Sequence, residues 1–118
     1  MFDRLEGERR YIAQLDIVDL KIAQIDRELR KLRGERGRVE RSLDEIERVV
    51  REIAGEDIDF SRPRPPFQEF FEEHNELQSR LNEIDLAIIR LGRDRDSLRK
   101  EKKALEKTWN GCGPLAFI

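Results

Sequence analysis

Apolar residues recur along two stretches of the chain at alternating steps of four and three residues. The first stretch consists of Tyr11, Leu15, Val18, Ile22, Ile25, Leu29, Leu32, Val39, Leu43, Ile46, Val50 and Ile53. The second consists of Phe67, Phe70, Leu77, Leu81, Ile84, Ile88, Leu91, Leu98, Leu105 and Trp109. Charged residues and glutamine fill most of the positions between them. This period is typical of long helices that pack along one narrow apolar seam.

A turn separates the two helical stretches. Ala54-Gly55 suits a helix C-terminus, because glycine adopts the left-handed conformation there without steric cost. The segment from Ser61 to Pro66 holds three prolines, and each disfavours helix in the residue before it, while Pro66 suits the first position of the next helix. We therefore expect a helix over about 8–54, a turn over about 55–66 and a helix over about 67–109.

The equal lengths of the two stretches predict an antiparallel hairpin with a defined register. With the turn centred on Phe60, facing residues have numbers that add up to 120, as Tyr11 and Trp109 do. The same rule places Leu43 opposite Leu77 and Ile53 opposite Phe67. The expected fold class is therefore all-α, a long antiparallel two-helix coiled-coil hairpin over residues 1–109.

Four basic residues occupy seam positions, and the register gives each an acidic neighbour on the facing helix. These basic residues are Arg36, His74, Arg95 and Lys102. Their expected partners are, in order, Asp85, either Glu45 or Glu47, Asp26, and Asp19. Long basic side chains can cover the seam while their charged groups reach such carboxylates, which fixes the register. An alternative hypothesis makes His74 a pH switch or a ligand.

Composition narrows the possible functions. Of 118 residues 42% are charged and 37% hydrophobic, with a net charge of -2 and a single cysteine. We expect one domain that lacks a thick core, and neither a nucleic-acid partner nor a disulfide framework. The sequence holds no membrane-spanning stretch, and its first residues do not resemble a signal peptide, so we expect a cytoplasmic protein.

Motifs of catalysis are absent from the sequence. It contains no phosphate-binding glycine-rich loop, no metal-binding histidine pair and no nucleophile elbow. We therefore expect no enzymatic activity, no cofactor and no metal site.

Some apolar residues lie outside the seam. Ala13, Ile17 and Leu20 form a stripe on the outer face of the first helix, and Leu86 and Ile89 do so on the second. Scattered exposed aliphatic residues are common on proteins. A two-helix hairpin buries little, however, so we expect these residues to join two copies into a four-helix assembly.

The C-terminal segment 110–118 differs from the rest of the chain because it carries no charged side chain. Asn110-Gly111-Cys112-Gly113-Pro114 should end the second helix, leaving a non-helical apolar tail. This tail either caps the hairpin ends or docks on a partner. The residues expected to take part are Cys112, Leu115, Phe117 and Ile118.

Three functional hypotheses follow. The first is a non-enzymatic protein–protein interaction module, such as an adaptor, spacer or scaffold, that binds itself and a second protein. In the second, a regulator inserts its acidic tip into a larger machine. The tip residues are Glu56, Asp57, Ile58, Asp59 and Phe60. This tip resembles that of the RNA polymerase secondary-channel factors, whose acidic coiled-coil tips support metal chemistry. The third is a leader or carrier that delivers the Cys112-containing tail.

Overall fold

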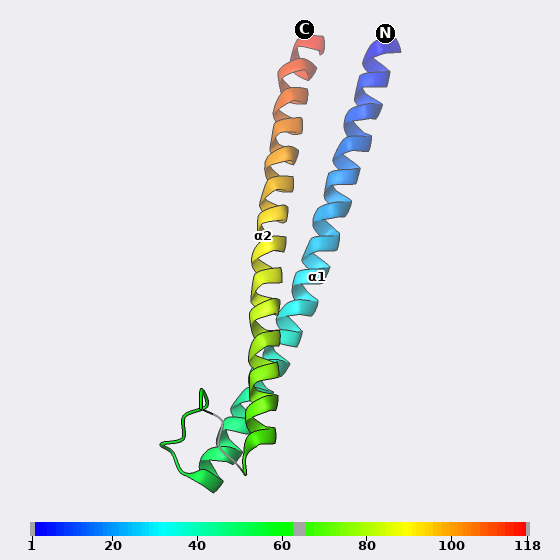
Figure 1. Cartoon of the computed structure of the whole chain (residues 1–118). Coiled ribbons are helices and arrows are strands. Elements are labelled where there is room, and N and C mark those ends of the chain that lie inside the picture. The colour runs from blue at the N-terminus through cyan, green and yellow to red at the C-terminus, as the bar shows by residue number, and fades with distance from the viewer. Residues whose placement is uncertain (1, 63–65, 118) are drawn as a thin grey trace. The chain divides into compact units, whose positions relative to one another are not determined.

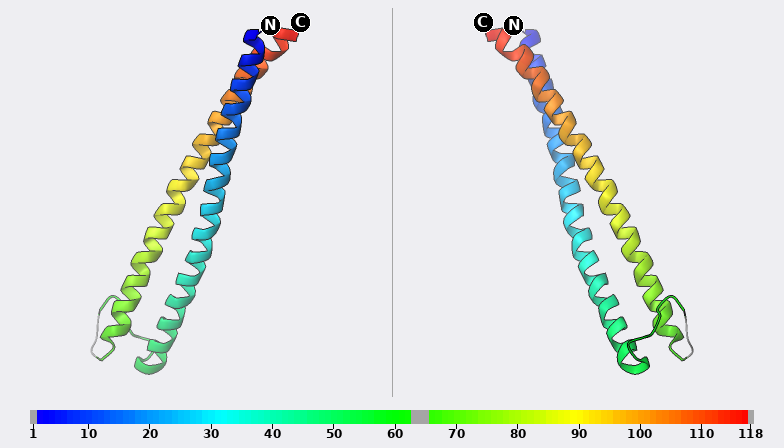
Figure 2. Two further views of the ribbon diagram at one scale, coloured as in Figure 1. Left: turned by 90° about the vertical axis from the view of Figure 1, so that its right-hand side faces the viewer. Right: turned by 90° about the vertical axis from the view of Figure 1, so that its left-hand side faces the viewer.

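The protein folds as a helical hairpin of two long α-helices. The computed structural model describes residues 2–62 and 66–117, and the side chains of 4–62 and 66–109. Helix α1 spans Phe2–Ala54 and helix α2 spans Gln68–Phe117, and the two run antiparallel (Figures 1 and 2). In the described part of the chain, neither helix is apolar enough over a sufficient length to cross a membrane.

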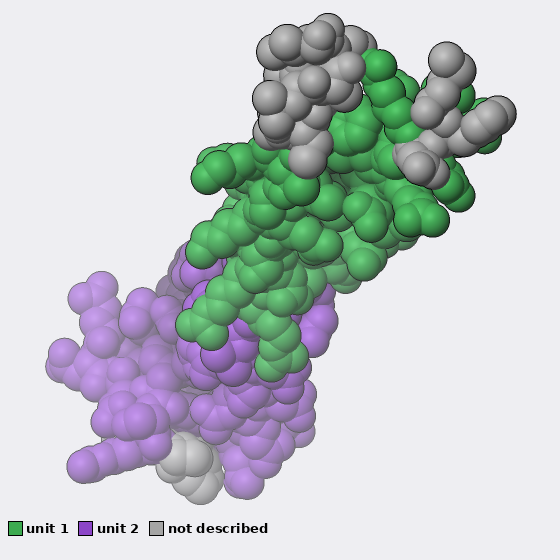
Figure 3. Space-filling view, turned by 90° about the horizontal axis from the view of Figure 1, so that it is seen from above, with its two compact units in different colours: residues 1–29, 90–118 green, residues 30–89 purple. Residues whose placement is uncertain are grey.

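The chain divides into two compact units (Figure 3). Unit 1 consists of residues 1–29 and 90–118, and unit 2 consists of residues 30–89. Each unit therefore contains part of both helices, and the loop between the helices belongs to unit 2.

Helix α1 begins earlier than the sequence pattern suggested, at Phe2 rather than near residue 8. Glu6 lies near its start, where negative charge is favourable beside the positive end of the helix dipole. At the other end, Gly55 has a φ of 100° and its N–H donates to the Arg51 carbonyl at 2.9 Å. This left-handed glycine ends α1 where Ala54-Gly55 predicted an end.

Helix α2 has ends that differ from the expected ones. Pro66 lies in the loop and not at the first helical position, because α2 starts at Gln68 and its first turn closes with the Phe71 N–H on the Phe67 carbonyl at 3.1 Å. The helical backbone continues to Phe117, past the end expected near residue 109. Glycine lowers helix propensity without forbidding helical angles, and the fixed φ of proline is itself compatible with a helix.

Unit 2 contains two adjacent hydrophobic clusters. The cluster near the loop is built on Val50 and Phe71, which are 0% and 1% exposed, together with Ile46 and Ile58. The next cluster consists of Val39, Leu43 and Ile84, covered by half-buried leucines and Ile88. Each cluster takes residues from both helices. Most of them lie at the heptad positions of the sequence, but Phe71 follows the heptad position Phe70, and Ile58 comes from the loop.

Unit 1 is held by the same seam with fewer buried residues. Among the described side chains, Val18 and Leu29 are its buried members. Near the chain ends, the rings of Tyr11 and Trp109 stack with centroids 4.9 Å apart and planes 10° from parallel. This contact is the one that the expected register requires.

The ion pairs between the helices confirm the register in both units. In unit 2, Arg36 Nε donates to Asp85 Oδ1 at 2.6 Å. Hydrogen bonding and charge attraction from Asp85, with a smaller attraction from Glu40, raise the pKa of Arg36 above its ordinary value.

Unit 1 contains the other two expected pairs between lysine or arginine and aspartate. Arg95 reaches Asp26 at 3.4 Å, and Lys102 Nζ lies 2.8 Å from Asp19. The hydrogen bond from Lys102 to Asp19 is the main reason that the pKa of this lysine lies above its ordinary value. All of these pairs are partly exposed, so they specify the register more than they add stability.

His74 lies in the seam of unit 2 and is 8% exposed. Its Nε2 is 3.0 Å from Glu47 Oε1, so the structure selects Glu47 over Glu45 as its partner. The ring also stacks on Phe60 with centroids 4.7 Å apart, and its Nδ1 is buried without a hydrogen-bond partner. A buried nitrogen of this kind lowers stability, because its hydrogen bond to water is lost and not replaced.

Substitutions of buried seam residues should lower the free energy of unfolding far more than the same substitutions on the exposed faces of the helices. Ile84→Ala should lower the free energy of unfolding by about 2–5 kcal/mol, because it leaves a cavity at a residue that is 1% exposed. Ile12→Ala removes the same atoms from a side chain that is 49% exposed, so its effect should stay near 0.5 kcal/mol or below. Urea unfolding followed by circular dichroism measures both. Equal effects would contradict the seam assignment.

Replacing His74 should not weaken the hairpin. His74→Leu removes the buried unpaired Nδ1 and supplies the residue type preferred in the seam, so the free energy of unfolding should stay unchanged or rise by about 1 kcal/mol. Glu47→Ala leaves the imidazole without its carboxylate partner, so it should lower the free energy of unfolding. Thermal melting of the two variants and of the natural protein tests this prediction, which fails if His74→Leu is less stable than the natural protein.

Candidate interaction surfaces

The aliphatic stripes that the sequence placed outside the seam are exposed. In unit 1, Ile17 and Leu20 are 54% and 57% exposed, and Ala13 is also exposed. In unit 2, Leu86 and Ile89 are 62% and 51% exposed. Large aliphatic side chains that are more than half exposed on two helix faces form candidate surfaces for a partner.

One seam residue of the expected register proves to be exposed. Ile53 was expected to face Phe67, but it is 62% exposed, so this prediction was wrong. The reason lies in the loop, whose Ile58 and Phe60 join the cluster around Val50 and Phe71. They fill the end of the seam that Ile53 would otherwise have covered.

The tip therefore presents its residues in two directions. Ile58 is buried and Phe60 is half buried, its ring lying 5.7 Å from that of Phe71. The Arg51 guanidinium carbon lies 5.6 Å from the centre of the Phe60 ring, a cation–π contact. The apolar pair thus anchors the loop on the hairpin, while Glu56, Asp57 and Asp59 remain exposed to solvent.

Asp59 organises the turn after the tip. One of its carboxylate oxygens accepts hydrogen bonds from the Ser61 hydroxyl at 2.6 Å and the Ser61 N–H at 2.9 Å. Arg62 lies 3.8 Å from the other oxygen. These hydrogen bonds hold the pKa of Asp59 below its ordinary value of 3.8, and the one from the Ser61 hydroxyl contributes most.

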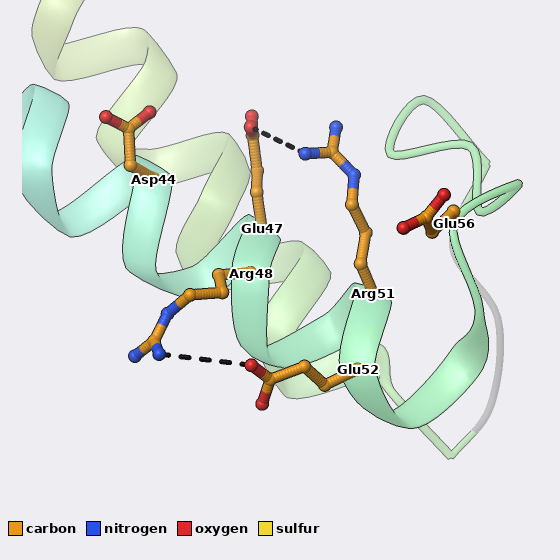
Figure 4. Close-up of a pocket in the computed structure, with 6 residues that line it drawn as sticks. All are labelled: Asp44, Glu47, Arg48, Arg51, Glu52 and Glu56. Atoms are coloured by element: carbon orange, nitrogen blue, oxygen red, sulfur yellow. Dashed lines mark ion pairs between the residues drawn. The ribbon is translucent and has the colours of Figure 1, made fainter.

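A hollow of about 490 Å³ lies beside the tip (Figure 4). It is lined by charged residues of α1 and by Glu56 of the loop. Within it, Arg48 pairs with Glu52 at 3.9 Å and Arg51 with Glu47 at 3.8 Å. Both ion pairs are long, and all of their residues except the half-buried Glu47 are exposed. The hollow is therefore a charged surface in contact with solvent. Among the described residues, no cluster of histidine, cysteine, aspartate and glutamate could hold a metal ion.

A second hollow, not anticipated from the sequence, lies in unit 1 beside the aromatic stack. It also measures about 490 Å³ and is mostly apolar, with Tyr11, Leu105 and Trp109 on its wall. Gly7 and Ala104 line it as well, and a Cβ added at Gly7 would meet no atom within 4 Å. The signal in the sequence was a small residue about one helical turn before each large ring, Gly7 before Tyr11 and Ala104 before Trp109.

The tail is the one candidate surface whose side chains lie outside the described residues. The backbone is described to Phe117, but the side chains of Cys112, Leu115 and Phe117 are not, and neither is Ile118. Capping and docking by this segment therefore stay predictions, as does the absence of enzymatic activity.

The Asp59 turn should respond to acid with a defined sign. A carboxyl group whose pKa is lowered by folding contributes stability above its unfolded pKa, and loses it as the pH falls through the folded value. The turn should therefore loosen below about pH 3.8. Ser61→Ala removes the hydroxyl donor, so the pKa of Asp59 measured by NMR titration should rise. Ser97→Ala, in the other unit, should leave it unchanged, and an unmoved pKa in Ser61→Ala would contradict the prediction.

Comparison with known proteins identifies no relative of this chain. No protein-family model, no curated protein and no solved structure matches the chain.

Proposed function

We propose that this protein is a protein–protein interaction module that dimerises through the outer faces of its helices and serves as an adaptor, spacer or scaffold. The exposed aliphatic stripe of Ala13, Ile17 and Leu20 carries this proposal. The stripe lies on a stable helix and not in a loop, so it presents a preformed surface to a partner.

The contrast between buried and exposed residues supports the proposal. Among the described side chains, nine hydrophobic residues are buried, while seven large ones are about half exposed or more. An ordinary monomer exposes single aliphatic side chains too. Here, however, the exposed residues nearly equal the buried ones in number, which is typical of a chain that buries more surface on association.

The total surface leads to the same conclusion. The accessible surface is 9246 Å², whereas a globular monomer of 14.0 kDa would expose about 6,700 Å². A stable protein–protein interface buries about 800 Å² on each partner. The excess is therefore larger than such an interface needs.

Introducing negative charge into the aliphatic stripe should dissociate the proposed dimer. Ile17→Glu together with Leu20→Glu places two carboxylates where apolar contact is required, so sedimentation equilibrium should show a dimer for the natural protein and a monomer for the variant. Helicity measured by circular dichroism should stay largely intact, because both side chains are exposed.

A matched control distinguishes the effect of added negative charge from the effect of losing the apolar surface. Gln78→Glu together with Ser79→Glu changes the net charge equally at exposed polar positions of α2, and it should leave the dimer intact. A monomeric natural protein at micromolar concentration would overturn dimerisation.

The other two functional hypotheses stay predictions. The exposed carboxylates of Glu56, Asp57 and Asp59 would suit a regulator with an acidic tip. Since Ile58 and Phe60 turn inward, such a tip would act through charge alone. Delivery of the tail would depend on Cys112, and deleting residues 112–118 tests it by loss of partner binding with unchanged dimerisation.

A further inference from the structure

The apolar seam of unit 1 has two edges that differ. At one edge, Arg95 and Lys102 of α2 reach Asp26 and Asp19 of α1, so ion pairs close the seam there. The other edge, called the open edge below, contains two hollows of about 490 and 580 Å³, each lined by residues of both helices. The first of them is the hollow beside the aromatic stack.

Both hollows lie on the same face of unit 1, because the residues that line them repeat with the heptad. A shift of fourteen residues carries every α1 residue of the first hollow onto one of the second. On α2, three residues of the second hollow recur seven residues later in the first. Residues whole heptads apart keep the same orientation toward the seam. The open edge is therefore one surface, about 30 Å long from Gly7 to Glu28 at the helical rise per residue.

The floor of the open edge consists of seam residues that the two helices leave half exposed. Ile25, Leu98 and Leu105 line the hollows and are only half buried, although their heptad positions place them in the seam. Covering them with a further helix would remove apolar surface from water, which favours association.

Ile17 connects the open edge with the aliphatic stripe of the proposed interface. It lies seven residues after Arg10 and seven before Gln24, which line the two hollows, so it shares their side of the helix. Its side chain is 54% exposed. The stripe is thus the outer margin of a larger surface that extends into the seam.

The two sides of the open edge carry opposite charge. Among the residues that line the hollows, α1 contributes two bases and one acid, which are Arg10, Lys21 and Glu28. The α2 side contributes the acids Asp94 and Glu101 and no base. All five side chains are exposed. The α1 side of one copy is therefore complementary to the α2 side of another.

We infer that the open edge of unit 1 binds the open edge of a second copy, so that their helices form a four-helix bundle about a twofold axis parallel to the helices. The inference rests on the proposed dimer and adds its surface and its residue pairs. In this bundle, α1 of each copy packs on α2 of the other at the height at which it packs on its own α2. Facing residues of the two copies then have numbers that add up to about 120, as within one chain.

The side chains that face one another in this bundle fit in charge and in size. Lys21 of one copy faces Glu101 of the other, and neither has an ion pair among the described residues of its own chain. Ile17 faces Ala104, which is small enough to leave room for it. Polar residues face one another on either side, Gln14 opposite Thr108 and Gln24 opposite Ser97.

The reversed arrangement, in which α1 packs on α1 and α2 on α2, lacks these pairs. The two α2 sides would then meet with their acids and no base among the residues that line the hollows. Facing like charges destabilise an interface, whereas facing opposite charges fix the orientation of the partners.

One pair of facing residues opposes the association. Glu28 of one copy faces Asp94 of the other, and both line the same hollow within a single chain. Glu28→Gln removes one of these like charges, so it should lower the dimer dissociation constant severalfold. A dissociation constant that rises in Glu28→Gln would contradict this pairing.

A charge exchange tests the pair of Lys21 and Glu101. Lys21→Glu and Glu101→Lys should each raise the dissociation constant, measured by sedimentation equilibrium, by on the order of tenfold. An equimolar mixture of the two variants should recover the natural affinity, because both symmetric contacts of the mixed dimer regain opposite charges. Within each chain the charges stay alike, so recovery reports contact between copies. A mixture as weak as its components would overturn the pairing.

A matched pair of alanine substitutions tests the apolar contact. Ala104→Lys places a charge against Ile17 and beside Lys21 of the second copy, so it should raise the dissociation constant by on the order of tenfold or more. Ala23→Lys makes the same change at an exposed alanine between Asp19 and Asp26, on the edge closed by ion pairs, and should leave the dimer intact. Circular dichroism should show unchanged helicity in both, because both alanines are exposed.

Disulfide formation tests the orientation. In a Cys112→Ser background, Gln14→Cys and Thr108→Cys each supply one exposed thiol. Oxidation should join the two proteins in an equimolar mixture and should leave each protein alone largely unjoined, because a disulfide requires Cβ atoms about 4 Å apart.

The outcomes separate this inference from the proposed function. A natural protein that sediments as a dimer, with Ala104→Lys as tight as Ala23→Lys or with disulfides formed only within the Gln14→Cys sample, would overturn the inference alone. A natural protein that sediments as a monomer would overturn the dimer and, with it, the bundle.

Discussion

A single apolar seam between two helices carries the hydrophobic packing of this protein. A helix packed against only one neighbour buries one stripe and leaves the rest of its surface in water. The buried residues lie between the two helices in each unit, Val18 and Leu29 in unit 1 and Val50 and Ile84 in unit 2. Any polar residue at a seam position is therefore close enough to the surface to find a charged partner there.

This geometry explains why the seam tolerates Arg36, Arg95 and Lys102. Their aliphatic portions lie in the seam and their charged groups reach Asp85, Asp26 and Asp19 at its edge. Each pair forms only when the helices are in this register. His74 is more deeply buried, because the loop residue Phe60 covers its ring; its Nδ1, like the Nε of Arg95, is buried without a hydrogen-bond partner.

The same geometry directs functional hypotheses to the surface. The two hollows of about 490 Å³ described above are open to solvent, one lined by ion pairs and the other by the Tyr11–Trp109 stack. The surface also provides exposed aliphatic residues on rigid helices. These are the features that support the proposed interaction module.

The periodicity of the sequence determined the two helices, their antiparallel packing and the partners of Arg36, Arg95 and Lys102, because a repeat sustained over many turns specifies one face and one register. Tertiary structure decided what happens where the repeat ends. Ile53 is exposed because Ile58 and Phe60, which belong to no repeat, fold back onto the seam. The choice of Glu47 over Glu45 and the hollow beside Gly7 likewise depend on side-chain directions that a heptad pattern does not encode. Local spacing specifies which residues share a face, whereas burial at a helix end depends on segments distant in sequence that compete for the same space.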